Sequence, residues 1–166
     1  MAAALPCLVA FLDYRLAPER RLPAAYDDAV SSLLGAAAEA DPWVAAHADL
    51  SRCYVMGSSS GGGGGGNMAF FAGLRLRANS SPDAGGVRGL LLHQPYLGDE
   101  ERTPSEARSG DDVVLLLKAN DKLWSLPLPE GADRDHKFCN PTRAPWRRWR
   151  SPACRGASSR GTAATR

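Results

Sequence analysis

The chain has 166 residues, a formal net charge of +2 and 44% hydrophobic residues, which is the size and composition of one soluble domain. No apolar run is long enough to span a bilayer, and the apolar start at 1–12 lacks the basic residues of a signal peptide. We therefore expect a cytoplasmic protein with no membrane partner. The four cysteines stand apart without a Cys-x-x-Cys pair, and with only three histidines beside them they predict neither a disulfide framework nor a metal site.

The charge is unevenly distributed along the chain. Residues 143–166 contain seven arginines and no acidic residue. A basic segment of this kind can bind nucleic acid, but this one has no lysine and no helical period. We therefore predict one folded domain over 1–141, followed by a disordered Arg-rich tail over 142–166 that binds no nucleic acid.

The first third of the domain begins with a strand-like segment and continues with a helix-like one. Leu8–Tyr14 is a short apolar run rich in β-forming residues, typical of a parallel strand buried on both faces. After a proline-punctuated loop, Pro23 suits the first turn of a helix, and Asp27 and Asp28 suit its N-terminal dipole. Apolar residues then recur on one helical face: Tyr26, Ala29, Val30, Leu33, Leu34 and Ala37.

Strand-like and helix-like segments continue to alternate. The pattern predicts a strand over 53–56, a helix over 67–78 and a strand over 87–96. The resulting β-α-β-α-β order indicates an α/β fold with a mostly parallel sheet flanked by helices. The stretch 111–128 is ambiguous between loop and helix, and no periodic pattern follows Pro141.

One pentapeptide in this series has the pattern of a catalytic motif. Gly57-Ser58-Ser59-Ser60-Gly61 follows the strand-like run and fits G-x-S-x-G, the nucleophile-elbow pattern. In an elbow, a sharp strand-to-helix turn exposes the central serine hydroxyl, and the flanking glycines leave room for strand and helix. Small residues also make ordinary loops, so a Gly/Ser turn without chemistry is the alternative interpretation of this stretch.

The same stretch departs from a simple elbow in its glycine content. Glycine runs unbroken over 61–66, whereas one or two glycines suffice before a helix. Each glycine inside a helix costs about 1 kcal/mol relative to alanine. The extra glycines are therefore predicted to lengthen the loop or to fray the first helical turn.

Several further motifs follow one another along the chain. They read DYRLAPE at 13–19, LPAAYDD at 22–28, DPW at 41–43, HADLSR at 47–52, LLHQPY at 91–96, ERTPSE at 101–106 and LPEGADRDH at 128–136. Together with the elbow and Asn67, these motifs resemble the plant carboxylesterases in the hormone-sensitive-lipase group of α/β-hydrolases, and the resemblance extends from Leu5 to about Pro141.

This resemblance implies a partial α/β-hydrolase fold, incomplete at both ends, in a lineage that hydrolyses small carboxylic esters without a cofactor or an obligate protein partner. It places the nucleophile at Ser59 and an oxyanion-binding N–H at Ser60, and it makes 63–66 an insertion. The family's His-Gly-Gly-Gly loop lies upstream of Leu8, and its catalytic Asp and His lie downstream of His136. Since this chain contains none of the three, we expect its catalysis to be impaired.

Only two histidines follow Ser59, so only they can complete a triad in the hydrolase order. His93 lies in a predicted strand with no acid shortly before it, and we interpret it as a packed strand histidine. His136 follows Asp133 and Asp135 and is the less favoured candidate base. Without a base, a serine hydroxyl is a poor nucleophile at neutral pH.

Two other functions remain as alternatives to an esterase. The gibberellin receptors share this fold, keep the elbow serine and use the former active site as a hormone pocket. A nucleotide-binding site is also formally possible, because the glycines at 61–66 satisfy G-x-G-x-x-G between a strand and a helix. Six consecutive glycines match any glycine pattern, so this second alternative has little support.

Overall fold

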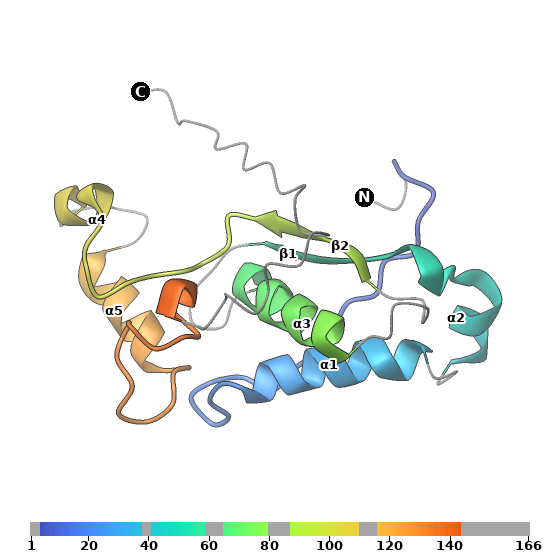
Figure 1. Cartoon of the computed structure of the whole chain (residues 1–166), viewed down its shortest axis with the longest axis horizontal. Coiled ribbons are helices and arrows are strands. Elements are labelled where there is room, and N and C mark those ends of the chain that lie inside the picture. The colour runs from blue at the N-terminus through green and yellow to red at the C-terminus, as the bar shows by residue number, and fades with distance from the viewer. Residues whose placement is uncertain (1–3, 38–40, 59–64, 80–86, 110–115, 144–166) are drawn as a thin grey trace.

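The computed structural model describes residues 4–37, 41–58, 65–79, 87–109 and 116–143. Figure 1 shows its elements in chain order. The strands are β1 (Cys53–Ser58) and β2 (Val87–His93). The helices are α1 (Ala24–Ala37), α2 (Pro42–His47), α3 (Gly65–Asn79), α4 (Pro104–Arg108) and α5 (Leu117–Ser125), with 3-10 turns η1 (Leu50–Arg52) and η2 (Pro141–Arg143).

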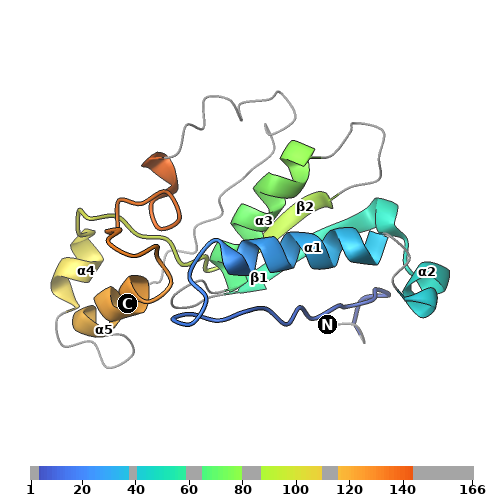
Figure 2. The same cartoon turned by 90° about the horizontal axis from the view of Figure 1, so that it is seen from below.

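The two strands form a parallel sheet covered on one face by helices. In the β1–β2 ladder, Tyr54 lies opposite Gly89 and Ser58 lies opposite His93. Figures 1 and 2 show α3 lying between this sheet and α1. The contact between sheet and helix is apolar, with Val55 of β1 buried against Ala69 and Leu76. The arrangement confirms the predicted α/β class with a parallel sheet.

The first predicted strand does not form. Residues 7–16 run without helix or strand, and β1 and β2 make up the only sheet in the part of the chain that the structure describes. Leu12 and Tyr14 pack against the core, whereas Phe11, which precedes Leu12, is 93% exposed, and Asp13 between the two packed residues is exposed as well. The segment therefore keeps the two-residue alternation of an extended chain, but it has no ladder partner, and β-formers alone do not make a strand.

The remaining element boundaries shift by a few residues from the predicted ones. β2 ends at His93, three residues early, because Gln94 adopts a φ of +47° and Pro95 has no N–H to donate. The predicted strand 53–56 extends to Ser58, and α5 makes 117–125 of the ambiguous stretch 111–128 helical, while 111–115 lie outside the described residues. The turn η2 includes Thr142 and Arg143, the first two residues of the predicted tail, and the rest of that tail, 144–166, lies outside the described part.

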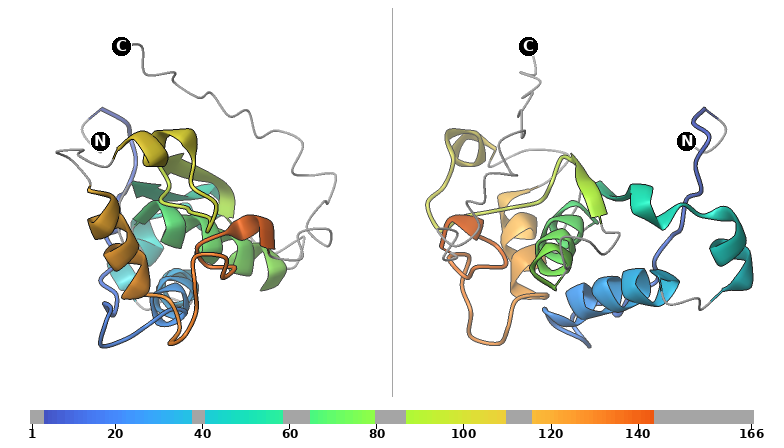
Figure 3. Two further views of the ribbon diagram at one scale, coloured as in Figure 1. Left: turned by 90° about the vertical axis from the view of Figure 1, so that its left-hand side faces the viewer. Right: turned by 45° about the vertical axis from the view of Figure 1, so that its right-hand side comes forward.

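The C-terminal part of the described chain packs next to the start of α1. Figures 1 and 3 show α4, α5 and the chain from 126 to 143 gathered at this end of the molecule. The guanidinium of Arg21 donates to the carbonyl oxygens of Ser125, Leu126 and Leu128 at 2.6–2.8 Å. One cation thereby pairs with three carbonyl oxygens at the C-terminal end of α5 and in the turn that follows it.

A polar group lies at the centre of the main core. The Tyr26 ring is buried, stacks on Phe71 with 5.0 Å between ring centroids, and meets the edge of Phe138. Its hydroxyl donates to Asn67 Oδ1 at 2.6 Å. The Asn67 amide nitrogen donates to the carbonyl oxygens of Tyr96 (3.1 Å) and Phe138 (2.9 Å). Four segments distant in sequence therefore meet at one buried amide.

We predict that Tyr26→Phe lowers the free energy of unfolding by about 1–3 kcal/mol, because it leaves a buried Asn67 oxygen without its donor. The measurement is urea denaturation followed by circular dichroism. Tyr54→Phe is the matched control, since Tyr54 is 58% exposed and should change stability by less than about 0.5 kcal/mol. Equal effects of the two substitutions would contradict a stabilising role for the buried hydrogen bond.

Candidate active site at the carboxyl ends of the strands

The predicted nucleophile and oxyanion residue, Ser59 and Ser60, lie outside the described residues. Their surroundings are described on both sides. β1 ends at Ser58 and α3 begins at Gly65, so the predicted elbow connects a strand to a helix as the G-x-S-x-G pattern requires. In parallel sheets, ligands bind outside the carboxyl ends of the strands, which is where this connection lies.

The strand and the helix approach each other most closely at Gly57. A Cβ atom built on Gly57 would lie 1.8 Å from the carbonyl oxygen of Gly65 and 2.7 Å from the Cβ of Ala69. No side chain fits in this space, so only glycine permits the contact. The first glycine of the motif therefore has the steric role that an elbow gives it.

The glycines at the start of α3 are packed as well. A Cβ on Gly65 would lie 3.0 Å from the Ser58 carbonyl oxygen, and one on Gly66 would lie 2.7 Å from Pro95 Cα. The helix begins two residues earlier than predicted and includes both glycines. Glycine at 65 and 66 thus allows close backbone contacts within the helix, while the rest of the glycine run, 61–64, for which a longer loop or a frayed turn is predicted, lies outside the described residues.

A serine–histidine pair lies at the ends of the two strands. Ser58 Oγ and His93 Nδ1 are 2.8 Å apart and hydrogen-bonded, and both residues are exposed. The two are register partners in the parallel ladder, so their side chains leave the sheet on the same face. The interpretation of His93 as a packed strand histidine is thus wrong. Sequence reasoning missed the pair because the sequence of either strand alone does not determine the register in which β1 pairs with β2.

His136, the other candidate base, is engaged within its own loop. Its ring Nδ1 accepts the backbone N–H of Phe138 at 3.3 Å, and its ring packs on the Phe138 ring. Burial, together with the nearby charge of Lys137, lowers the pKa of His136 below its ordinary value. These contacts give the residue a structural role in the loop.

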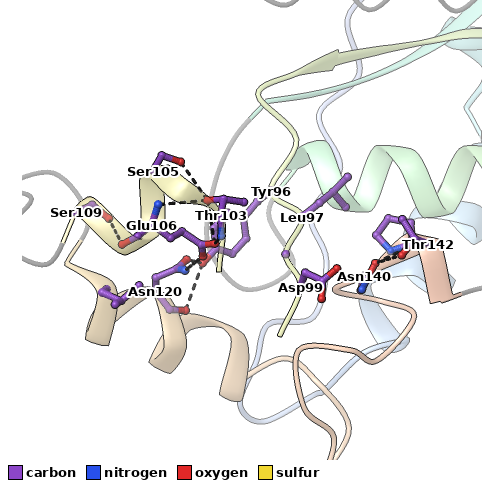
Figure 4. A pocket seen from close by; sticks show the side chains of 13 residues that line it. Tyr96, Leu97, Asp99, Thr103, Ser105, Glu106, Ser109, Asn120, Asn140 and Thr142 are labelled. Atoms are coloured by element: carbon purple, nitrogen blue, oxygen red, sulfur yellow. Dashed lines mark hydrogen bonds between the residues drawn. The ribbon is translucent and has the colours of Figure 1, made fainter. Parts of the chain in front are cut away.

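A pocket of about 640 Å³ lies beside the chain that follows β2. Figure 4 shows Thr103 and Glu106 near α4, Asn120 on α5, and Asn140 and Thr142 across from them. The Tyr96 hydroxyl donates to Asn120 Oδ1 on the pocket wall. The lining of the pocket combines apolar surface with a few amide, hydroxyl and carboxylate groups, a composition suited to a small organic molecule.

The charge of the pocket wall is balanced by a buried arginine. The Arg134 side chain is 8% exposed and lies 2.7 Å from Glu106 Oε1 and 3.3 Å from Asp121 Oδ1. Burial opposes ionisation of Glu106, but hydrogen bonds from the Thr103 N–H and from Arg134 outweigh it, and the pKa of Glu106 falls below its ordinary value. The wall thus carries a fixed carboxylate at neutral pH.

A protein-family model described as the alpha/beta hydrolase fold matches residues 1–154. The chain belongs to this family. The match covers β1, β2 and the helices between and after them, which confirms the fold expected from the sequence motifs.

Among curated relatives, the chain is 43% identical over 152 residues to a 3-O-acetylpapaveroxine carboxylesterase of Papaver somniferum, covering 87% of this chain and 47% of that protein. It is 45% identical over 144 residues to carboxylesterase 20 of Arabidopsis thaliana, covering 86% and 42%. A gibberellin receptor of Arabidopsis thaliana matches at 36% identity over 135 residues, covering 81% and 35%. The chain spans less than half the length of these relatives.

A solved structure of similar fold is an ester hydrolase from the metagenome of Lake Arreo, complexed with a bipyridine phosphonate derivative. It has a TM-score of 0.63 and 27% identity, and the match covers 80% of this chain and 39% of that one.

Across the described ranges of our chain, no cluster of three His, Cys, Asp or Glu side chains is placed to hold a metal ion. Those ranges also contain no helix long and apolar enough to cross a membrane.

We predict that Gly57→Ala costs about 3 kcal/mol of stability or more, because the added methyl overlaps the backbone of α3. Thermal unfolding measures the effect. Gly35→Ala in α1 is the matched control: its added Cβ meets nothing within 4 Å, and it should stabilise the helix by up to about 1 kcal/mol. A Gly57→Ala protein as stable as the wild type would refute the tight strand–helix contact.

We also predict a pH-dependent contribution from Glu106. Because its folded pKa lies below the unfolded value of 4.5, its stabilisation is complete above about pH 4.5 and is lost as pH falls through the folded pKa. The stability advantage of the wild type over Glu106→Gln should therefore shrink on acidification below pH 4.5, measured by urea denaturation at several pH values. The exposed Glu130, as Glu130→Gln, serves as control and should show no such trend.

Proposed function

We propose that this protein is a carboxylesterase-type serine hydrolase that acts on small carboxylic esters. The observation that supports the proposal is the close contact of Gly57 with the first turn of α3, because a nucleophile elbow requires a glycine where its strand meets its helix. The carboxylesterase relatives and the ester hydrolase of similar fold support the same reaction class.

In this proposal, Ser59 is the nucleophile and forms an acyl-serine intermediate that water hydrolyses. The backbone N–H of Ser60 donates to the developing oxyanion, and the N-terminal end of α3 adds its positive dipole. No cofactor takes part.

A hormone-binding role is the second candidate function. It is supported by the gibberellin receptor relative and by the pocket beside α4 and α5. The identity to this relative is 36%, against 43% and 45% for the carboxylesterases, so the esterase proposal takes precedence.

We further propose a cytoplasmic location, which the free thiols of Cys7, Cys53 and Cys139 support, because reducing compartments keep cysteines unpaired.

We predict that a fluorophosphonate probe forms an adduct on Ser59 and that Ser59→Ala removes this adduct and lowers the protein-dependent hydrolysis of p-nitrophenyl acetate. Mass spectrometry of the tryptic peptide 53–75 locates the adduct, and absorbance at the p-nitrophenolate band gives the rate. Ser125→Ala, at the end of α5, serves as control and should change neither. Absence of any adduct on Ser59 in the wild type would overturn the proposal.

A further inference from the structure

The hydrogen bond between Ser58 and His93 has no part in the function proposed above. It joins a hydroxyl and an imidazole, the two groups that form the core of a serine hydrolase, at 2.8 Å. A nucleophile and its base act at about 2.6–3.2 Å, so the pair already has the separation that proton transfer needs. Both residues are exposed, so a reagent can reach them.

The backbone holds the pair in place from both sides. Ser58 is the last residue of β1 and His93 is the last residue of β2, and the ladder sets them opposite each other. Directly after His93, the positive φ of Gln94 turns the chain away, and Pro95 is fixed against Gly66. The pair therefore rests on rigid elements.

The surroundings of the pair suit acyl transfer to a serine. The pair lies on the face of the sheet away from α3, because Ser58 alternates along β1 with Gly57, the position that contacts the helix. On the same face of the sheet, Met56 and Leu91 are register partners and are 48% and 53% exposed. They offer an apolar surface next to the hydroxyl for the acyl chain of an ester.

We propose that Ser58 and His93 form a catalytic dyad that accepts an acyl group from activated esters, separately from Ser59. In the neutral ring with its proton on Nε2, His93 Nδ1 takes the hydroxyl proton while Ser58 Oγ forms a bond to the carbonyl carbon. The tetrahedral intermediate then expels the alcohol oxygen, which either takes the proton from Nδ1 or leaves as an anion while Nδ1 gives its proton to solvent water, so that the imidazole is neutral again. His93 next removes a proton from water, which attacks the acyl-serine and releases the acid and the Ser58 hydroxyl.

The composition of the dyad defines its substrate class. No ion pair joins His93 to a carboxylate among the described residues, so no acid steadies the imidazolium that forms in the reaction. Esters of acidic alcohols, such as aryl esters, expel a stable anion and depend least on that help. We therefore assign aryl esters and similar activated acyl or phosphonyl donors to this site, with an apolar acyl chain that lies along Met56 and Leu91.

The test places the adduct on a particular serine, using the full chain and a fluorophosphonate probe. Reaction at Ser58 forms a P–O bond and releases fluoride, with the hydroxyl proton passing to His93. We expect the wild type to carry adducts on Ser58 as well as Ser59, and Ser59→Ala to retain the Ser58 adduct. In the Ser59→Ala background, His93→Gln should slow labelling of Ser58 by about a hundredfold or more, as expected for loss of a general base.

Controls separate chemistry from folding. His47→Gln, in exposed α2, should leave labelling of Ser58 unchanged, and His93→Asn should reproduce the loss seen with His93→Gln while circular dichroism shows both variants folded. A Ser59→Ala protein with no adduct on Ser58 would overturn the dyad, as would Ser58 labelling that is insensitive to both His93 substitutions. An adduct on Ser58 but none on Ser59 would overturn the esterase proposal for Ser59 and leave the dyad standing.

Discussion

The side-chain amide of Asn67 is the contact on which the rest of the structure depends. It lies in the first turn of α3, is fully buried, and joins the Tyr26 hydroxyl to the carbonyl oxygens of Tyr96 and Phe138. An amide in an apolar core is costly unless its donors and acceptor are satisfied, and all three of these bonds run to other segments. The core therefore closes in one arrangement of these four segments.

This arrangement sets the geometry at the ends of the strands. Holding the Tyr96 carbonyl against α3 fixes the chain that leaves β2, and Pro95 then fits against Gly66, where no Cβ has room. With that chain fixed, His93 lies opposite Ser58, and the connection that carries Ser59 starts and ends on rigid elements. The hydrogen bonds of the buried Asn67 amide thus help to set the position of the exposed serine–histidine pair.

Short-range sequence patterns correctly predicted most helices and strands. The predictions failed where the outcome depended on pairing between segments that are far apart in the sequence. α1 follows from Pro23 and a clear helical period, and the strand before Gly57 follows from its apolar run and the elbow glycine. Leu8–Tyr14 has equal β-character but no ladder partner among the described residues, so it stays irregular. The Ser58–His93 pair joins residues 35 positions apart, and its formation depends on a register that neither segment encodes alone.

The two-stranded sheet also bears on how the protein behaves in concentrated solution. Within the described chain, β1 pairs with a strand on one side only, and Tyr54 and Met56 on its uncovered face are 58% and 48% exposed. A strand edge with free N–H and C=O groups beside exposed apolar side chains is a template for strand addition by another molecule. Self-association through β1 would scale with protein concentration, and low concentrations with charged substitutions on this face are the natural means of keeping the protein monodisperse.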